Sequence, residues 1–344
     1  MREVHKQLVR SPPMDVLMIG GTGLTSRETS LLVAATPGVR LFLLNRGESA
    51  DDLPPNVTRL RGDVRGDPAV LRGALGDRRF DAVIDFLALR PEHVRQAIDL
   101  FRGRCGQYVF ISSVSVYQKP PVHYRVTEST PLVNPYLPYA QQKIACEELL
   151  MAEHRANGFP FTVVRPSLTY DRTTVPFVIP GLQHGWTIVN RVLTRRPLVV
   201  PGDGTSLHVT THARDLAKAL VGLLGQTRAI GHAFHVAADE AHTWDGMAHL
   251  IGAIVGVEPV IAHVTTDQIA RVQPEFANKL RGTKIWSVVY DTAKLKEFVP
   301  GFAATTTLRQ GIEESIAYLR ADPARQVIHE ETDRLHDELA AIAG

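Results

Sequence analysis

The feature that most restricts the fold is an apolar run that leads directly into a glycine-rich turn. Asp15 to Ile19 is typical of a short buried strand, Gly20-Gly21-Thr22-Gly23 follows at once, and a helical stretch continues to Ala35. Glycines let a backbone approach phosphate groups, and the amino terminus of a helix presents N–H groups with a partial positive charge. A strand before the turn and a helix after it are the context that a dinucleotide requires. We therefore expect a dinucleotide site in this part of the chain.

Strands and helices continue to alternate through the next part of the chain. Four further strands are predicted, at 39–44, 58–64, 81–86 and 107–112. Two helices are predicted between them, at 68–75 and 91–101. This alternation predicts an α/β fold with a doubly wound parallel sheet, whose ligands lie at the carboxyl ends of the strands.

The end of the second predicted strand bears on the choice of cofactor. NAD-selective folds usually place an acid there, but this chain has Asn45 and Arg46. The planar guanidinium of Arg46 could pair with a 2′-phosphate, which favours NADP, or it could be a solvated side chain in a turn. Asp63, after the third strand, could accept from the adenine amino group or cap the next helix. The expected cofactor is NADP or NAD.

Tyr139 and Lys143 are four residues apart and should share one face of a helix. A tyrosine needs roughly 4 kcal/mol of phenolate stabilisation to act as a base near pH 7. One ammonium group about 4 Å away could supply that much at an effective dielectric constant near 20. The same spacing also arises by chance in helices with a surface tyrosine beside a solvated lysine.

The sequence resembles the extended short-chain dehydrogenase/reductase family, whose members include nucleotide-sugar epimerases, dehydratases and reductases. The resemblance runs from the glycine turn to residues 298–302. The motifs that carry it occur in the family's order: Gly20-x-x-Gly23, Ser113 four residues before Tyr117, Tyr139 with Lys143, Arg165-Pro166, Gly202-Asp203-Gly204, and Asp215-Leu216-Ala217.

The resemblance implies a role for each matching residue. Tyr139 would exchange a proton with the substrate, Lys143 would bind the nicotinamide ribose and hold the phenolate pKa down, and Ser113 would hydrogen-bond the reacting oxygen. The neighbouring Ser112 and Ser115 are expected to satisfy local backbone groups. The dinucleotide is expected to contact the following residues: Gly20, Thr22, Gly23, Leu24, Thr25, Asn45, Arg46, Asp63, Val64, Leu87 and Lys143.

The chain also departs from the family's pattern. Dehydratases and decarboxylases of the family have an acid directly after the catalytic Ser or Thr, but Val114 and Ser115 stand here, which disfavours elimination. Ser26 replaces the third glycine of the turn and would either loosen the cofactor loop or bond a phosphate oxygen. His208 replaces an arginine that contacts the substrate diphosphate in relatives, so we expect weak binding of a diphosphate substrate.

Other residues are candidates for the substrate side. Asp171, where the family usually has glycine, could bond sugar hydroxyls, repel an anion or cap a turn. Three arginines could restore the missing positive charge, or could form a solvated face: Arg191, Arg195 and Arg196. The candidate substrate-binding residues are Ser113, Tyr170, Asp171, Arg191 and His208.

Composition limits the remaining possibilities. The chain has 344 residues and a formal net charge of +2, which favours neither nucleic acid nor an anionic membrane as a partner. Cys105 and Cys146 lack metal-ligand spacing, the histidines are scattered, and the polar start from Met1 to Pro13 lacks a signal-peptide core. We expect a cytoplasmic protein without a metal site, a nucleic-acid partner or a membrane partner.

The predicted organisation has two lobes. Residues 14–170 form the dinucleotide-binding domain, to which 210–240 return, and the substrate lobe comprises 171–209 and 241–320. Residues 321–344 form an amphipathic tail that either packs as a helix or binds a partner.

We expect an epimerase that acts on a secondary alcohol or ketone of a sugar or sugar-nucleotide-like substrate, with a homodimer left open. The alternative within the same class is an NADP-dependent ketoreductase or dehydrogenase. The alternative of another class is a non-catalytic regulator that binds a dinucleotide or RNA.

Overall fold

The computed structural model describes residues 13–47, 52–179 and 185–343. Almost all of the polar start from Met1 to Pro13 therefore lies outside the described residues.

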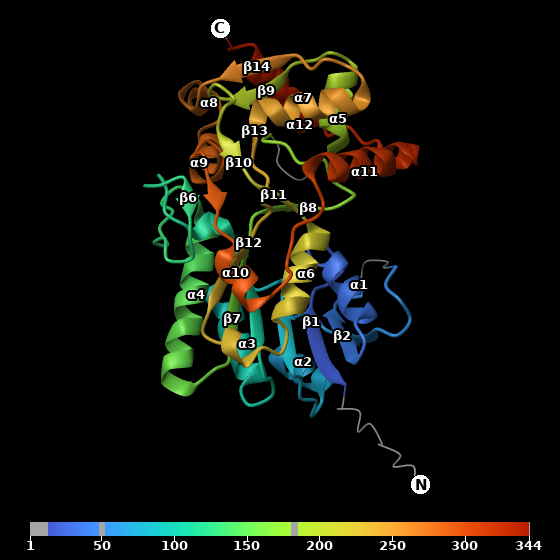
Figure 1. Cartoon of the computed structure of the whole chain (residues 1–344), viewed down its shortest axis with the longest axis vertical. Coiled ribbons are helices and arrows are strands. Elements are labelled where there is room, and N and C mark those ends of the chain that lie inside the picture. The colour runs from blue at the N-terminus through green and yellow to red at the C-terminus, as the bar shows by residue number, and fades with distance from the viewer. Residues whose placement is uncertain (1–12, 48–51, 180–184, 344) are drawn as a thin grey trace, which may run out of the picture.

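The secondary structure follows the predicted alternation over the first half of the chain (Figure 1). The strands are β1 (Met14–Ile19), β2 (Val39–Asn45), β3 (Thr58–Arg61), β4 (Ala82–Asp85), β5 (Tyr108–Ile111), β6 (Arg125–Val126), β7 (Phe161–Pro166), β8 (Leu168–Tyr170), β9 (Leu198–Pro201), β10 (Leu207–His208), β11 (Thr210–His212), β12 (Ala233–Val236), β13 (His242–Thr243), β14 (Ile261–Val264) and β15 (Val289–Tyr290). The helices are α1 (Arg27–Ala35), α2 (Pro68–Leu75), α3 (Pro91–Phe101), α4 (Pro138–Asn157), α5 (Gly185–Leu193), α6 (Ala213–Leu223), α7 (Trp244–Val255), α8 (Thr266–Val272), α9 (Pro274–Thr283), α10 (Ala293–Phe298), α11 (Leu308–Arg320) and α12 (Glu330–Ala340), with short 3-10 helices at Val114–Val116, Thr227–Ala229 and Pro323–Arg325.

Seven strands form one parallel sheet in the order β12-β7-β5-β4-β1-β2-β3. The prediction of a doubly wound α/β fold is therefore confirmed. After β1 the chain adds β2 and β3 on one side, and it then returns to add β4 and β5 on the other side. The order reverses between β1 and β4, and a crevice for a ligand opens at such a point outside the carboxyl ends of the strands.

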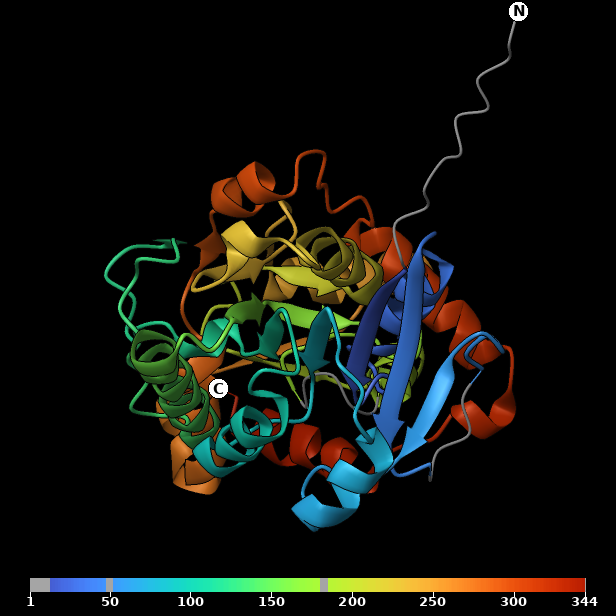
Figure 2. The same ribbon diagram turned by 90° about the horizontal axis from the view of Figure 1, so that it is seen from below.

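Alternate residues of the central strands enter two different cores. In β1, Val16 and Met18 pack against one face of the sheet, and Leu17 and Ile19 pack against the other. The first core includes residues of α1 and α6, and the second includes residues of α2, α3 and α4. Figure 2 shows the sheet between these two layers of helices. Because both faces are covered, the central strands β1, β4 and β5 are largely apolar and buried, which explains the continuous apolar runs of the sequence.

The observed strands stop earlier than several of the predicted ones. The third strand ends at Arg61 rather than at residue 64, and the fourth ends at Asp85 rather than at 86. Asp85 terminates its strand because its carboxylate accepts from the backbone N–H groups of Leu87 and Ala88, both at 2.8 Å. These early ends leave Asp63 and Leu87 in loops at the carboxyl edge of the sheet.

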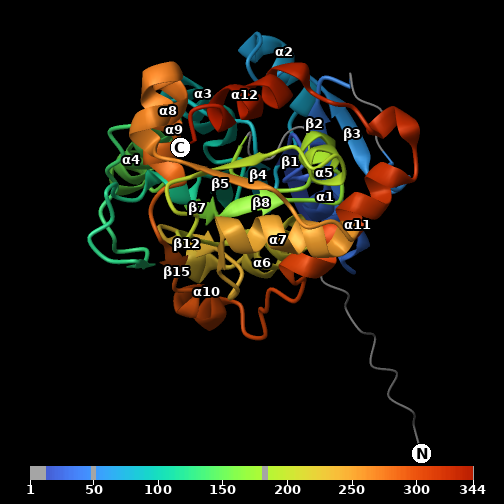
Figure 3. The ribbon, with the colours of Figure 1, turned by 90° about the horizontal axis from the view of Figure 1, so that it is seen from above.

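A second body of structure covers the carboxyl edge of the sheet. Its own apolar core joins α5, α7, α8, α9, α11 and α12 with β9 and β14. Figure 3 shows α7, α11 and α12 above the strands of the main sheet. Among the described residues, no helix combines the length and apolar character needed to cross a membrane.

Candidate active site

The turn after β1 has a backbone that only glycine adopts easily. Gly20 has φ +92° and Gly21 has φ +108°. A Cβ atom on Gly21 would lie 2.3 Å from the Leu43 Cδ1 atom and 2.8 Å from the Ser30 Oγ atom. At Gly21 the turn therefore lies against the sheet with no room for a side chain, and the turn leads into the amino terminus of α1, as a pyrophosphate requires.

Ser26, in place of the third glycine, is accommodated by bonding within the turn. Its Oγ accepts from the Gly23 N–H at 3.1 Å, and its side chain is almost fully buried. The loop is thus fastened by this serine. Neither alternative raised by the sequence, a loosened loop or a contact to phosphate, is needed to explain the substitution.

A cavity of about 320 Å³ extends from the glycine turn along the ends of β2 and β3. Nine of the residues expected at the dinucleotide line it: Gly20, Thr22, Gly23, Thr25, Asn45, Arg46, Asp63, Val64 and Leu87. Leu24 does not line it. Asn45 and Asp63 also shape their own turns, because their side chains accept from the backbone N–H groups of Gly47 and Arg65. The residues around this cavity are therefore suited to bind the adenosine half of a dinucleotide.

A second cavity, of about 340 Å³, adjoins the first, and Thr25 and Phe86 line both. Ser113, Tyr139 and Lys143 all line this second cavity. They come from the segment after β5 and from the first turns of α4, so the sheet and one long helix bring them together. The two cavities form a continuous site at the carboxyl edge of the sheet.

Lys143 is held by backbone carbonyl groups that the sequence did not reveal. Its Nζ donates to the oxygens of Ala88 and Ile111, both at 2.7 Å, and lies 5.8 Å from the centre of the Tyr139 ring. Burial lowers the pKa of this ammonium group to about 8. The two carbonyls hold the ammonium group in the wall of the second cavity.

Tyr139 is 41% exposed, yet partial burial of its phenol raises its pKa, while a hydrogen bond with Ser113 acts in the opposite direction. The expectation that Lys143 holds this pKa down stays a prediction, since its ammonium group lies 5.8 Å from the centre of the Tyr139 ring and keeps its charge while it donates to two carbonyls. Ser113 Oγ in turn accepts from the backbone N–H of Ser115 at 3.2 Å and from its hydroxyl at 3.0 Å. Ser113 thus connects Tyr139 to the 3-10 turn at Val114–Val116.

The roles expected for Ser112 and Ser115 are also corrected. Both hydroxyls bond side chains rather than backbone groups: Ser115 bonds Ser113, and Ser112 donates to the carboxylate of Glu147. Glu147 lies one turn after Lys143 on α4, and so Ser112 joins the end of β5 to the catalytic helix.

A network of buried polar side chains continues from Glu147 beneath the cavity. Arg165, on β7, donates to both carboxylate oxygens of Glu147, with its Nε at 3.1 and 3.2 Å, and to the Tyr117 hydroxyl at 3.1 Å. The Tyr117 hydroxyl also lies 3.0 Å from Nδ1 of His235, on β12. These side chains connect the segment after β5 with β7, β12 and α4. In the Arg165-Pro166 motif, Arg165 therefore acts in this network and does not line the cavity, whereas Pro166 is part of the cavity wall.

His208 lines the second cavity, as expected of a substrate-side residue. It is 5% exposed, and its ring lies 4.2 Å from that of Trp244, centre to centre. Burial, followed by the charge of Lys284 and then that of Lys119, keeps its pKa well below the usual value. His208 is thus neutral near pH 7, and the two lysines that act on it are cavity residues that sequence reasoning missed.

Tyr170 and Asp171 do not line either cavity, so their predicted contact with substrate is corrected. Tyr170 is 1% exposed, and its ring packs edge-on against His212. The Asp171 carboxylate accepts from the N–H of Thr173 at 2.9 Å and from its hydroxyl at 2.6 Å. Asp171 therefore caps its own turn, which is the structural alternative considered from the sequence.

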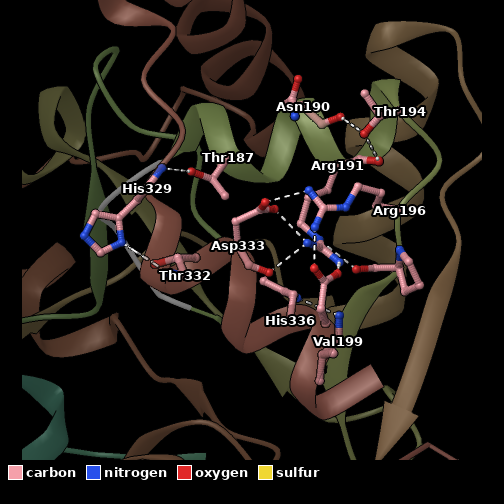
Figure 4. A network of polar contacts seen from close by, with 12 residues as sticks. Thr187, Asn190, Arg191, Thr194, Arg196, Val199, His329, Thr332, Asp333 and His336 are labelled. Carbon is pink, nitrogen blue, oxygen red and sulfur yellow. Dashed lines mark hydrogen bonds and ion pairs between the residues drawn. The ribbon is translucent and has the colours of Figure 1, made fainter. Parts of the chain in front are cut away.

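The predicted contact of Arg191 with substrate is also corrected, because this side chain points toward the carboxyl-terminal helix (Figure 4). Its side chain is fully buried and pairs with Asp333 at 2.7 Å and with Asp337 at 2.8 Å. Arg196 pairs with the same two carboxylates, which stand one turn apart on α12. His336, between them, accepts from the Val199 N–H at 2.9 Å. The arginines fasten α12 to the second lobe and do not supply charge to the cavity.

The chain belongs to the NAD dependent epimerase/dehydratase family. Residues 16–237 match that family's model, and this range includes the glycine turn and the Ser113, Tyr139 and Lys143 set. The resemblance inferred from the sequence, to the epimerases and dehydratases among the extended short-chain dehydrogenase/reductases, is thereby confirmed.

Similar proteins carry several different names. A chloroplast stem-loop binding protein of 41 kDa from Arabidopsis thaliana is 27% identical over 280 residues, which cover 76% of this chain and 70% of the relative. An uncharacterized UDP-glucose epimerase of Bacillus subtilis is 25% identical over 234 residues, covering 66% of each chain. The solved UDP-glucose 4-epimerase of Thermus thermophilus, a complex with NAD, is 20% identical with a TM-score of 0.69, and the match covers 89% of this chain and 99% of that one. This last likeness shows the fold.

Proposed function

We propose that this chain is an NAD(P)-dependent epimerase that acts on a secondary alcohol or ketone of a sugar or sugar-nucleotide-like substrate. The observation that carries the proposal is that Ser113, Tyr139 and Lys143 line one cavity, which adjoins the glycine-lined cavity. Residues 14–170 and 210–240 would hold the dinucleotide, and the second lobe would hold the substrate. A cytoplasmic location and a homodimer also belong to this proposal.

The residues of the cavity have distinct roles in this reaction. When bound, a nicotinamide supplies hydride acceptance and return. Tyr139 takes the proton of the substrate hydroxyl during oxidation and gives it back during reduction. Ser113 fixes the Tyr139 hydroxyl and the reacting oxygen, while Lys143, held by Ala88 and Ile111, binds the ribose beside them. Val114 and Ser115 offer no acid for elimination, which favours epimerisation over dehydration.

Mass spectrometry of the gently purified protein tests the proposal, because an epimerase regenerates its dinucleotide in each cycle and has no need to release it. We expect a retained dinucleotide, and epimer formation from a UDP-hexose or a free sugar without net change in NADH absorbance. An empty dinucleotide site, together with net cofactor consumption, would support a ketoreductase in its place.

Arg46 provides the observation that favours the ketoreductase alternative, since it lines the adenosine cavity where an acid would select NAD. We expect Arg46→Ala to weaken NADP binding by roughly 1.5–3 kcal/mol, as for a charge-assisted hydrogen bond, and to leave NAD binding nearly unchanged. Fluorescence titration of both dinucleotides measures this, with Arg72→Ala, which removes an exposed arginine outside the cavity and should change neither affinity, as the matched control. Equal losses for NAD and NADP would show that Arg46 does not read the 2′-phosphate.

The name of the Arabidopsis relative raises stem-loop binding as a function of another class. We propose no nucleic-acid partner for this chain, because its net charge is only +2 and its catalytic set is complete. A mobility-shift titration with a structured RNA tests this, and salt-sensitive binding at submicromolar protein would overturn it.

A further inference from the structure

Two lysines that the proposed mechanism does not use face the candidate active-site cavity. The lining residues, all in the part of the chain that the structure describes, include Lys119, Lys143 and Lys284 and no Asp or Glu. Lys143 donates to two carbonyl groups. No ion pair joins Lys119 or Lys284 to a carboxylate among the described residues. The cavity therefore has an excess of positive charge.

The two lysines are held by unrelated segments that converge on His208. The Lys119 backbone N–H donates to the Val133 carbonyl at 2.8 Å, and the residue is 5% exposed. The Lys284 carbonyl accepts from the Trp244 indole N–H at 2.8 Å, and its ammonium group lies 5.1 Å from the centre of a Trp244 ring. His208 stacks on the same tryptophan, and the charges of both lysines act on its ring. The three side chains thus belong to one local cluster.

His208 provides an independent sign of a missing ligand. Its Nε2 is buried and makes no hydrogen bond of normal geometry among the described residues, although the ring lines the cavity and the Lys284 backbone is near enough to act on its pKa. A buried polar atom without a partner is unfavourable, as is an ammonium group taken from water without a counter-charge. Burial lowers the pKa of both lysines to about 8, so each is charged near pH 7 and costly to keep unpaired. An anion that accepts hydrogen bonds from Lys119, Lys284 and His208 would give all three groups a partner and would remove these free-energy costs.

We propose that Lys119, Lys284 and His208 form an anion site in the active-site cavity, so that the substrate carries a phosphate or carboxylate group. This inference rests on the proposed function, since it assumes that the substrate occupies the cavity beside Tyr139. The two lysines supply the positive charge that is missing because His208 stands in place of an arginine. The sequence had suggested Arg191, Arg195 and Arg196 for this role. The expectation of weak binding of a diphosphate substrate, which rested on His208, changes accordingly.

Calorimetry on the full chain, saturated with the dinucleotide that it binds more tightly, tests the site. The probes are glucose 1-phosphate, glucuronate and UDP-glucose, with glucose as the neutral reference. We expect at least one anionic probe to bind about tenfold or more tightly than glucose. Lys119→Met and Lys284→Met should each weaken that probe about tenfold or more, the scale of a hydrogen bond to a charged group. Which probe responds distinguishes a phosphoryl group from a carboxylate.

Matched variants separate this site from general effects of charge and folding. Lys279→Met removes an exposed lysine outside the cavity and should change nothing, while Lys284→Arg should retain most of the affinity. Lys119→Gln replaces Lys119→Met if the latter fails to fold. Equal affinities of glucose and all three anions, or anion affinity that survives in both lysine variants, would overturn the anion site with dinucleotide binding intact. Failure of the unmodified chain to bind a dinucleotide would overturn the proposed function itself.

Discussion

Tyr139→Phe is expected to lower turnover by at least about 10²-fold while leaving dinucleotide affinity within about twofold of the unmodified enzyme. The physical reason is the loss of the proton donor and acceptor, since a positioned acid or base contributes about 10²–10⁴-fold. Phenylalanine keeps the ring that Lys143 approaches, so the walls of the cavity should persist. Steady-state kinetics with the UDP-hexose or free sugar for which epimer formation is detected gives the rate, and fluorescence titration gives the dinucleotide affinity.

Tyr124→Phe is the matched control, because Tyr124 is 56% exposed and does not line the cavity. It should leave both measurements unchanged. Near-normal turnover of Tyr139→Phe would contradict the assigned role and would shift attention to Ser113 as the group that handles the proton.

Arg165→Met is expected to destabilise the fold by about 3–5 kcal/mol, the scale for breaking one side of a buried ion pair. The side chains of Arg165 and Glu147 are only 5% and 6% exposed, so the variant would leave the Glu147 carboxylate buried with Ser112 as its remaining partner. The free energy of unfolding, measured by urea titration, should fall by this amount. Because Glu147 stands one turn after Lys143, turnover should also decline in the folded fraction.

The double variant Arg165→Met with Glu147→Leu should recover most of this loss, since apolar replacement of both partners removes the uncompensated charge. Arg214→Met is the control, because the side chains of its pair with Glu314 are 43% and 35% exposed, and the expected change is no more than about 1 kcal/mol. Equal losses in Arg165→Met and Arg214→Met would show that the buried network does not hold the site together.

The sequence by itself determined the α/β class, the parallel sheet, the glycine turn and the set of Ser113, Tyr139 and Lys143. These features depend on contacts close in the chain: apolar periodicity, the conformational freedom of Gly20 and Gly21, and the four-residue spacing on α4. Where a site is built at the ends of successive strands, its residues follow from the order of those strands. This is why most of the residues expected at the adenosine cavity line it.

Only the tertiary structure decided which distant charges face the cavity. In the sequence, Arg191 and Arg196 looked available to supply positive charge to the substrate. In the structure they pair with Asp333 and Asp337, which lie about 140 positions later in the chain. Lys119 and Lys284 lie in loops without a motif, and their relation to His208 depends on how Trp244 packs. Charge pairing is set by proximity in space, which local sequence patterns do not contain. The nature of the substrate therefore depends on packing, whereas the chemistry of the reacting residues follows from local spacing.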